Sequence, residues 1–232
     1  MTTSPEPLDN PPWHALSGRH ANLAQGAAGL ALRYRPDVAA FAAVKHMTQD
    51  AFDALATLIP AGDFVWLMSL APIPAMDRVH GDVLFSVCQM VDTARVDAAP
   101  DDGVLRLSKD DVPDMMSLAD KTRPGPFSRS TIEMGNYVGI RDGGELIAMA
   151  GERMCLDGYV EISAVCVDER HRGRGLAQRL MNILRKEIRA RGDVPFLHVR
   201  DDNASAIRLY ERMGFETRQV LLLNRVAHRQ LY

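Results

Sequence analysis

Apolar residues in the second half of the chain follow two kinds of spacing. From residue 176 to residue 188 they lie three or four positions apart, with arginines and a lysine between them, and this pattern predicts an amphipathic helix that ends at Gly192. Elsewhere they come in short runs flanked by turn-forming residues, as β-strands require. These runs predict strands at Val104–Leu107, Tyr137–Ile140, Leu146–Cys155, Tyr159–Val167, Phe196–Val199 and Val220–Val226.

Local signals between the strands predict how they connect. Residues Ser108–Asp111 have the Ser-x-x-Asp form of a helix start, and a helix is expected to run from there to about Asp120. The glycine-bearing turn Arg141–Gly144 joins two apolar runs and predicts an antiparallel hairpin. Residues Asn203–Met213, followed by Gly214, predict a further helix.

The first half of the chain predicts helices and strands but offers no chemistry. Phe52, Leu55 and Ile59 have helical spacing, and the runs Phe64–Leu70 and Val83–Met90 predict strands. Residues 13–95 are therefore expected to form a smaller α/β unit or an additional sheet layer.

Composition predicts the limits of that segment. Residues 1–12 contain four prolines among polar residues and are expected to be a flexible tail. The segment Asp97–Gly103 concentrates Asp, Pro and Gly, which predicts a connector. A second unit, residues 104–232, would follow the connector.

Charge and composition exclude several classes of protein. The formal net charge is −3, without a basic region of the kind that nucleic-acid-binding proteins use. The cysteines Cys88, Cys155 and Cys166 stand among apolar residues, which favours reduced thiols and a cytoplasmic protein.

No secretory signal or membrane-spanning apolar run is evident, so no membrane partner is expected. The histidines lack metal-ligand spacing, so no metal is expected.

The strongest chemical signal is the segment Asp168–Ala177, which lies between a predicted strand and a predicted helix. A turn at this place directs free backbone N–H groups and the positive end of the helix dipole to one point. Gly173 and Gly175 allow an anion to approach the backbone closely, and three arginines add positive charge. The turn lacks the Gly-Lys-Ser/Thr ending of a nucleotide-binding P-loop, and it lacks the third glycine of a dinucleotide-binding fingerprint. Solvated arginines on an ordinary loop are the alternative interpretation.

Two motifs carry a resemblance to the GNAT superfamily of N-acyltransferases. Arg172–Ala177 is similar to the family signature Arg/Gln-x-x-Gly-x-Gly/Ala, with a strand before it and a helix after it. About thirty residues further on, Asn203–Phe215 resembles the family pattern Asn-x-x-Ala-x-x-x-Tyr-x-x-x-Gly-Phe. The resemblance covers residues 104–226 and implies an α/β fold with a mixed, mostly antiparallel central sheet. Residues 13–95 would add an N-terminal α/β extension.

The resemblance implies roles for individual residues. The donor would be acetyl-CoA, with its pyrophosphate held by backbone N–H groups of Arg172, Gly173, Arg174, Gly175, Leu176 and Ala177. Its pantetheine arm would pair with main-chain atoms of Val165, Cys166 and Val167, where two strands splay apart. Asn203 resembles a residue near the pantetheine, although it is equally a good N-cap. Tyr210 resembles the tyrosine that returns a proton to the departing thiolate, with a core tyrosine as the alternative.

An amine must lose its proton before it attacks, so a general base is expected. Glu161 is the candidate because strand alternation puts it on the same face as Val165, toward the acyl carbon. A solvated carboxylate at a strand end is the alternative, and Glu133 and Glu152 are candidates that the sequence does not rank. Cys166 invites a nucleophilic interpretation, but its apolar neighbours favour an inert thiol.

The chain is therefore predicted to be an N-acyltransferase, by resemblance an acetyltransferase, that moves an acyl group from acyl-CoA to a primary amine by direct attack in a ternary complex. The acceptor, a small molecule or a protein amine, stays open. So does the oligomeric state, for which the family implies a homodimer as one outcome. A second interpretation is a catalytically silent acyl-CoA-binding regulatory or interaction module, and a third is a generic nucleotide-phosphate binder.

Overall fold

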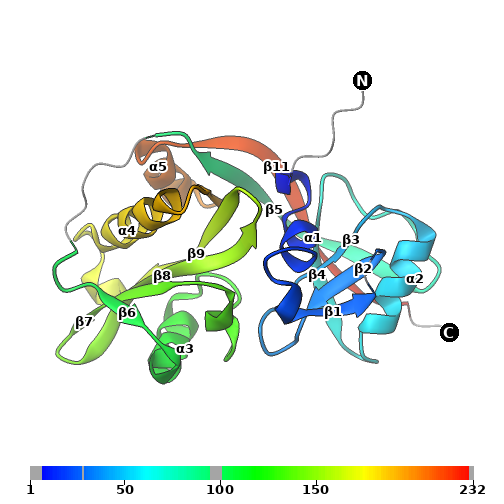
Figure 1. Ribbon diagram of the computed structural model, residues 1–232, viewed down its shortest axis with the longest axis horizontal. Coiled ribbons are helices and arrows are strands. Elements are labelled where there is room, and N and C mark those ends of the chain that lie inside the picture. Colours follow the sequence, from blue (N-terminus) through cyan, green and yellow to red (C-terminus); the bar gives the residue numbers. More distant parts are fainter. Residues whose placement is uncertain (1–6, 28, 95–100, 230–232) are drawn as a thin grey trace.

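The computed structural model describes residues 7–27, 29–94 and 101–229, whose strands form two sheets (Figure 1). The large sheet has eight strands in the order β4-β11-β5-β10-β9-β8-β7-β6, and the small sheet has the order β1-β2-β3. The strands are β1 (Ala24–Ala27), β2 (Ala31–Tyr34), β3 (Ala42–Val44), β4 (Phe64–Ser69), β5 (Val79–Asp92), β6 (Leu105–Leu107), β7 (Tyr137–Asp142), β8 (Glu145–Leu156), β9 (Tyr159–Val167), β10 (Val194–Arg200) and β11 (Phe215–His228). The α-helices are α1 (Pro11–Leu16), α2 (Gln49–Leu58), α3 (Val112–Thr122), α4 (Leu176–Ala190) and α5 (Ala204–Arg212).

The large sheet is mixed and mostly antiparallel, as predicted. Its paired strands run antiparallel, except β9 and β10, which run parallel. The helices α3 and α4 cover its two faces (Figure 1). Leu180 and Leu184 of α4 are fully buried in one hydrophobic cluster, whereas Met115 and Leu118 of α3 belong to another. The apolar stripe read from the sequence of α4 is thus the face that packs on the sheet.

Several predicted connections are confirmed. Ser108 and Asp111 form a capping box ahead of α3. The Ser108 hydroxyl oxygen accepts a hydrogen bond from the Asp110 N–H at 3.3 Å, and Asp111 Oδ2 accepts one from the Ser108 N–H at 2.9 Å. The strands β7 and β8 form the expected antiparallel hairpin. Gly143 and Gly144 in its turn have positive φ angles of 55° and 88°, which glycine adopts without strain.

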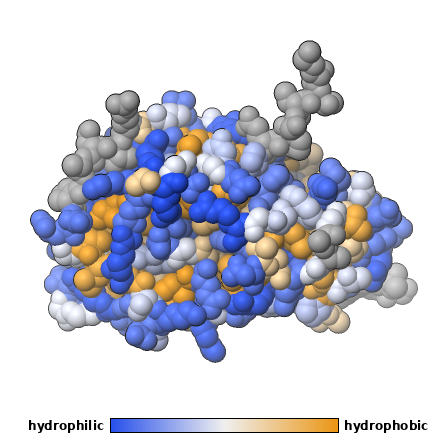
Figure 2. Space-filling model, viewed as in Figure 1, coloured by the Kyte–Doolittle hydropathy of each residue, from blue (hydrophilic) through white to orange (hydrophobic). Residues whose placement is uncertain are grey.

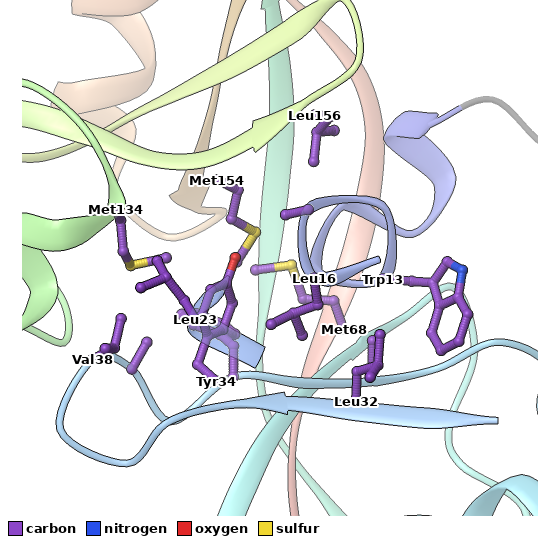
Figure 3. Close-up of a cluster of buried hydrophobic side chains, with 14 of the residues drawn as sticks. Trp13, Leu16, Leu23, Leu32, Tyr34, Val38, Met68, Met134, Met154 and Leu156 are labelled. Carbon is purple, nitrogen blue, oxygen red and sulfur yellow. The ribbon is translucent and has the colours of Figure 1, made fainter. Parts of the chain in front are cut away.

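The N-terminal segment contributes to both sheets. The strands β4 and β5 pair with β11 in the large sheet, whereas α1 and α2 pack on the small sheet. A buried hydrophobic cluster joins the small sheet to the large one, because Leu16 of α1 and Tyr34 of β2 lie beside Met154 and Leu156 of β8 (Figure 3). The division of the chain into units at 13–95 and 104–232 stays a prediction.

The predicted N-terminal tail is wrong for residues 7–12. These residues form a 3-10 helix, Pro7–Asp9, and the beginning of α1. Leu8 is 1% exposed, and its carbonyl oxygen accepts a hydrogen bond from Gln89 Nε2 at 2.9 Å. The prolines at the beginning of α1 are compatible with the helix, since its first N–H groups have no intrahelical partner. Residues 1–6, and residues 95–100 of the predicted connector, lie outside the described residues.

The surface of the molecule is mostly hydrophilic on the face shown in Figure 2, where hydrophobic residues form patches between hydrophilic ones. No helix in the described ranges has the length and apolar character needed to cross a bilayer. Those ranges also hold no group of three or more His, Cys, Asp or Glu side chains placed to bind a metal ion.

Candidate active site

A cleft with a volume of about 1460 Å³ is lined by residues from both halves of the chain. The second half contributes the ends of β9 and β10, α5, residues 122–127 and residues from 171 to 178. The first half contributes the apolar side chains of Phe41, Trp66, Met68, Phe85 and Val87. The cleft thus brings the predicted anion-binding turn and aromatic residues of the N-terminal segment into one site.

The cleft opens where β9 and β10 separate. Both strands are fully described, and they pair only through Tyr159–Glu161 and Val194–Phe196. Beyond that point β9 continues beside β8 and β10 continues beside β5, and residues 165–167 and 198–200 line the cleft. This separation leaves one edge of β9 open to an extended ligand that can pair with it as a strand would.

The turn before α4 has a backbone conformation that requires glycine. Gly173 and Gly175 have φ angles of 77° and 72°, and a Cβ at either position would meet no atom within 4 Å. Conformation rather than space therefore selects glycine here. Gly175 is the N-cap of α4, and Leu176 and Ala177 line the cleft beside it. The N–H groups of the first turn of α4 lie at the cleft, and this arrangement fits a pyrophosphate.

The three arginines of this turn have different surroundings. The Arg170 guanidinium lies 3.0 Å from Asp168 and 2.9 Å from Glu145, so carboxylates already engage it. Arg174 is exposed in the turn and is not among the described residues that line the cleft. Arg172 lines the cleft, and its side chain is the best placed of the three to approach an anion.

Asn203 and Tyr210 come from α5 and its N-cap, and both line the cleft. The Oδ1 atom of Asn203 accepts a hydrogen bond from the Ala206 N–H at 3.1 Å, so its role as an N-cap is confirmed, while ligand contact stays a prediction. The ring of Tyr210 packs against Phe215, with centroids 6.1 Å apart. Burial raises the pKa of Tyr210 to about 12, so the phenol keeps its proton at neutral pH.

The structure does not place Glu161 in the cleft, and this part of the prediction is wrong. The side chain is fully buried, and Arg153 donates to it from Nε at 2.8 Å and from Nη2 at 2.5 Å. His198 Nδ1 lies 2.7 Å from Glu161 Oε1. Burial alone would raise the pKa of Glu161, but the charge and hydrogen bonds of Arg153 and His198 hold it at about 2. Such an acidic carboxylate is a poor general base.

A β-bulge explains why alternation misplaced Glu161. The register passes from Gly151 opposite Ser163 to Met149 opposite Cys166, so β9 has one more residue than β8 between these pairs. Ala164, inside this interval, has a positive φ of 52°. The extra residue reverses the alternation, and Val165 packs in the cluster on the α4 side, away from the buried pair of Glu161.

The other candidates for proton transfer or nucleophilic attack are also unsuited. Glu152 accepts a hydrogen bond from Arg191 at 2.6 Å, and Glu133 accepts one from Arg35 at 2.6 Å. Neither glutamate is among the described residues that line the cleft. Cys166 does line it, but burial raises the pKa of its thiol to about 11, as expected of an inert thiol.

Sequence reasoning missed one wall of the cleft entirely. Phe41, Trp66 and Phe85 line it, as do Arg153 and His198. Phe41 and Trp66 form an edge-to-face pair with ring centroids 5.6 Å apart. These residues belong to no motif and lie far apart in the sequence. The pairing of β4 and β5 with β11 brings Trp66 and Phe85 to the site, and an isolated β-bridge to Trp66 places Phe41 beside them.

Known proteins match the second half of the chain at the level of sequence. A family model described as FR47-like protein matches residues 137–223. The N-alpha-acetyltransferase RimI of Mycobacterium tuberculosis is 39% identical over 98 residues, which cover 40% of this chain and 60% of the relative. The uncharacterized N-acetyltransferase YobR of Bacillus subtilis is 32% identical over 72 residues, which cover 31% of this chain and 29% of the relative. The chain thus spans less than two thirds of the length of these relatives.

Solved structures match the chain over nearly its whole length. A structure assigned to the GNAT family, from Novosphingobium aromaticivorans, has 36% identity and a TM-score of 0.89, and the match covers 97% of this chain and 100% of that chain. A GCN5-related N-acetyltransferase from Kribbella flavida, at 16% identity, has the same fold, with a TM-score of 0.62 over 91% of this chain and 93% of that one.

A mixed sheet with two splayed strands and a helix N-terminus at the resulting cleft defines the fold of an N-acetyltransferase. The chain belongs to the GNAT family, and its relatives are N-acetyltransferases of that family.

Proposed function

We propose that this protein is an acyl-CoA-dependent N-acyltransferase, with acetyl-CoA as the donor and a primary amine as the acceptor. One observation carries the proposal: a single cleft joins the N-terminus of α4 at Gly175 to the gap between β9 and β10. The first place suits the pyrophosphate of the donor, held by backbone N–H groups of Arg172–Ala177. The second suits the extended pantetheine arm, paired with main-chain atoms of Val165–Val167.

Direct attack of the amine on the thioester, with both substrates bound, is the mechanism that this arrangement supports. Backbone N–H groups at the open edge of β9 polarise the acyl carbonyl. Tyr210, protonated at neutral pH because its pKa is about 12, donates a proton to the departing thiolate. Asn203 caps α5 and so positions the helix that carries Tyr210.

The proton of the amine leaves by a different route from the one first predicted. Glu161 is buried behind Arg153 and His198, and within the described lining of the cleft Asp120 is the one carboxylate. Asp120 lies exposed near the end of α3. We therefore assign proton removal to water in the cleft, and Glu161 becomes a residue that positions Arg153.

Replacing the phenol tests the proposed mechanism. Tyr210→Phe removes the proton donor while keeping the ring, so we expect kcat for thiol release from acetyl-CoA with an amine to fall on the order of 100-fold. The Kd for acetyl-CoA should change little. The measurement is steady-state thiol release together with calorimetric binding.

The same change at Tyr159 is the matched control, because Tyr159 is half-buried against Phe196 and does not line the described cleft. Tyr159→Phe should keep the wild-type kcat. If the wild-type protein binds acetyl-CoA but releases no thiol with any amine, the catalytically silent binding module is the correct function and the enzyme proposal fails.

A further inference from the structure

Arg153 presents a hydrogen-bond donor that no described residue satisfies. Its side chain is 10% exposed and lines the cleft, and Nε and Nη2 both donate to Glu161. The third nitrogen, Nη1, makes no hydrogen bond to any residue that the structure describes. Nη1 is not among the described buried atoms that lack a partner, so it reaches the solvent of the cleft, where an acceptor atom of a ligand can take the place of water.

The orientation of Arg153 is fixed before any ligand arrives. The two hydrogen bonds to Glu161 hold the guanidinium as a fork, and its carbon lies 4.9 Å from the centre of the Phe41 ring. His198 Nδ1 holds the same carboxylate at 2.7 Å. The donor at Nη1 is therefore preorganised, which lowers the entropic cost of binding a ligand oxygen.

Aromatic and aliphatic side chains surround this donor. Phe41 and Trp66 form an edge-to-face pair, and Phe85 lines the cleft beside a second cation, with the Arg200 guanidinium 4.4 Å from its ring centre. Met68 and Val87, with Leu223 of β11, complete the apolar lining from this side. A flat, apolar body fits such a wall better than a hydrated chain does.

The charges of the cleft disfavour an acceptor with a second positive charge. Its described lining contains Arg123, Arg153, Arg172, Arg200 and Arg212. Asp120 is the one carboxylate in that lining, and it lies exposed near the end of α3. Arg153 and Arg200 are each paired with a carboxylate, Glu161 and Asp202, so the net positive charge is smaller than this list suggests. A polyamine would find only Asp120 as a carboxylate in the described lining, whereas an anionic or carbonyl oxygen would meet several guanidinium groups.

We propose that the acceptor is an α-amine whose neighbouring carbon bears a carboxylate or carbonyl oxygen and whose side chain is aromatic or apolar. Arg153 Nη1 donates to that oxygen, and the wall of Phe41, Trp66 and Phe85 holds the side chain. The inference rests on the proposed function, since it names the acceptor of the same site. Two sources share this chemistry, a free amino acid and the N-terminus of a peptide.

The reaction balances with these two substrates alone. The bond between the acyl carbon and the sulfur of the donor breaks, and a bond between that carbon and the α-nitrogen forms. The nitrogen gives one proton to water in the cleft, and the thiolate receives one from Tyr210, which is reprotonated by solvent. The products are an N-acylated amino compound and the free thiol.

A panel of related acceptors tests the inference at saturating acetyl-CoA. Phenylalanine and phenylalaninamide carry the oxygen, phenylethylamine lacks it, and spermidine has further positive charges. We expect kcat/KM for the first two to exceed that for phenylethylamine by at least about tenfold and that for spermidine by at least about 100-fold. A tripeptide that begins with phenylalanine distinguishes the sources, since it should match phenylalaninamide if the cleft admits a peptide and fail if it admits only the free amino acid.

Arg153→Lys keeps a positive charge beside Glu161 but removes the fork and its free donor. In this variant we expect the preference for phenylalanine over phenylethylamine to fall toward one, through a higher KM for phenylalanine. Arg141→Lys is the matched control, because Arg141 likewise binds carboxylates through two nitrogens, here those of Asp111 and Asp114, but lies outside the described lining of the cleft. Trp66→Leu should raise KM for both phenylalanine and phenylethylamine and leave the ratio of their kcat/KM values unchanged.

The outcomes separate this inference from the proposed function. If phenylethylamine or spermidine is the best acceptor, if Arg153→Lys keeps the wild-type preference, or if none of the panel is acetylated although acetyl-CoA binds, the inference on the acceptor is overturned. Failure to bind acetyl-CoA in calorimetry with the same preparation would overturn the proposed function itself.

Discussion

His20 is a buried histidine whose two ring nitrogens both have partners. The residue is 5% exposed, with Nδ1 2.9 Å from the Tyr34 hydroxyl and Nε2 2.9 Å from the carbonyl oxygen of Met134. Nε2 therefore carries the proton and donates to Met134, while Nδ1 accepts from Tyr34. Burial lowers the pKa of His20 to about 4, although the hydrogen bond to Met134 opposes this shift. The neutral ring thus links the N-terminal segment to the loop before β7.

This lowered pKa predicts a loss of stability in mild acid. The unfolded chain binds a proton at His20 near pH 6.5, whereas the folded chain does so only near pH 4, so protons favour unfolding as pH falls through this window. Between pH 7 and pH 5 the free energy of unfolding should fall by about 2 kcal/mol more in the wild type than in His20→Gln. Urea unfolding at both pH values measures the difference.

Glu161 does not contribute to the difference between the wild type and His20→Gln in this pH range, because its pKa of about 2 in the folded protein keeps it ionised at pH 5. The stability that Glu161 contributes is complete above its ordinary pKa of 4.5 and is lost only as pH falls from there toward 2. Parallel curves for the wild type and His20→Gln between pH 7 and pH 5 would show that His20 is not held neutral by the fold.

The turn before α4 and the first residues of this helix are proposed to bind the pyrophosphate together. Gly175 at the N-cap of α4 and Gly192 just after its C-terminal end both have positive φ, 72° and 86°. A Cβ at either position would meet no atom within 4 Å. The two glycines thus carry the same conformational requirement at opposite ends of one helix, and only one end faces the cleft.

Because Gly175 and Gly192 have the same conformational requirement, substitutions at the two positions give a controlled test of the turn. Gly175→Ala and Gly192→Ala should each lower the free energy of unfolding by about 1–2 kcal/mol, because alanine is strained at positive φ. Only Gly175→Ala should weaken acetyl-CoA binding, by about tenfold or more, since it shifts the N–H groups that hold the pyrophosphate. Thermal unfolding and calorimetry measure the two effects. Equal losses of affinity in both variants would mean that α4 contributes stability and not a binding site.

Elements with strong local signals could be predicted from the sequence. The capping box at Ser108, the hairpin turn at Gly143–Gly144 and the apolar stripe of α4 depend on residues close together in the chain. The bulge at Ala164 could not be predicted, because a bulge is defined by the residues of the partner strand. The sequence therefore led to the right strand but to the wrong face for Glu161.

The whole molecule is joined by a hydrophobic cluster that crosses from the N-terminal segment to the large sheet. Leu16 of α1 and Tyr34 of β2 pack with Met154 and Leu156 of β8 (Figure 3). The sequence showed no motif before residue 104, so neither this packing nor the aromatic wall that β4 and β5 bring to the cleft could be foreseen. Long-range pairing of β4 and β5 with β11 places Trp66 and Phe85. The packing of α1 on β8 places Leu16 in the cluster.

Such shared packing predicts that the protein unfolds in one cooperative transition. Leu16→Ala removes a side chain that is 1% exposed and should lower the free energy of unfolding by about 2–5 kcal/mol. Tryptophan fluorescence, which reports on Trp13 and Trp66 in the N-terminal segment, should change together with far-UV circular dichroism. Separate midpoints for the two signals would show that the N-terminal segment unfolds independently.

Calorimetric titration of the purified protein with acetyl-CoA, ATP and NAD is the most direct test of the central claim that the cleft binds the diphosphate and the extended arm of coenzyme A. We predict saturable one-site binding of acetyl-CoA at least about tenfold tighter than either nucleotide, because only acetyl-CoA fills both the α4 N-terminus and the gap between β9 and β10. Absence of heat with acetyl-CoA at millimolar concentration, or equal or tighter binding of ATP or NAD, would contradict it.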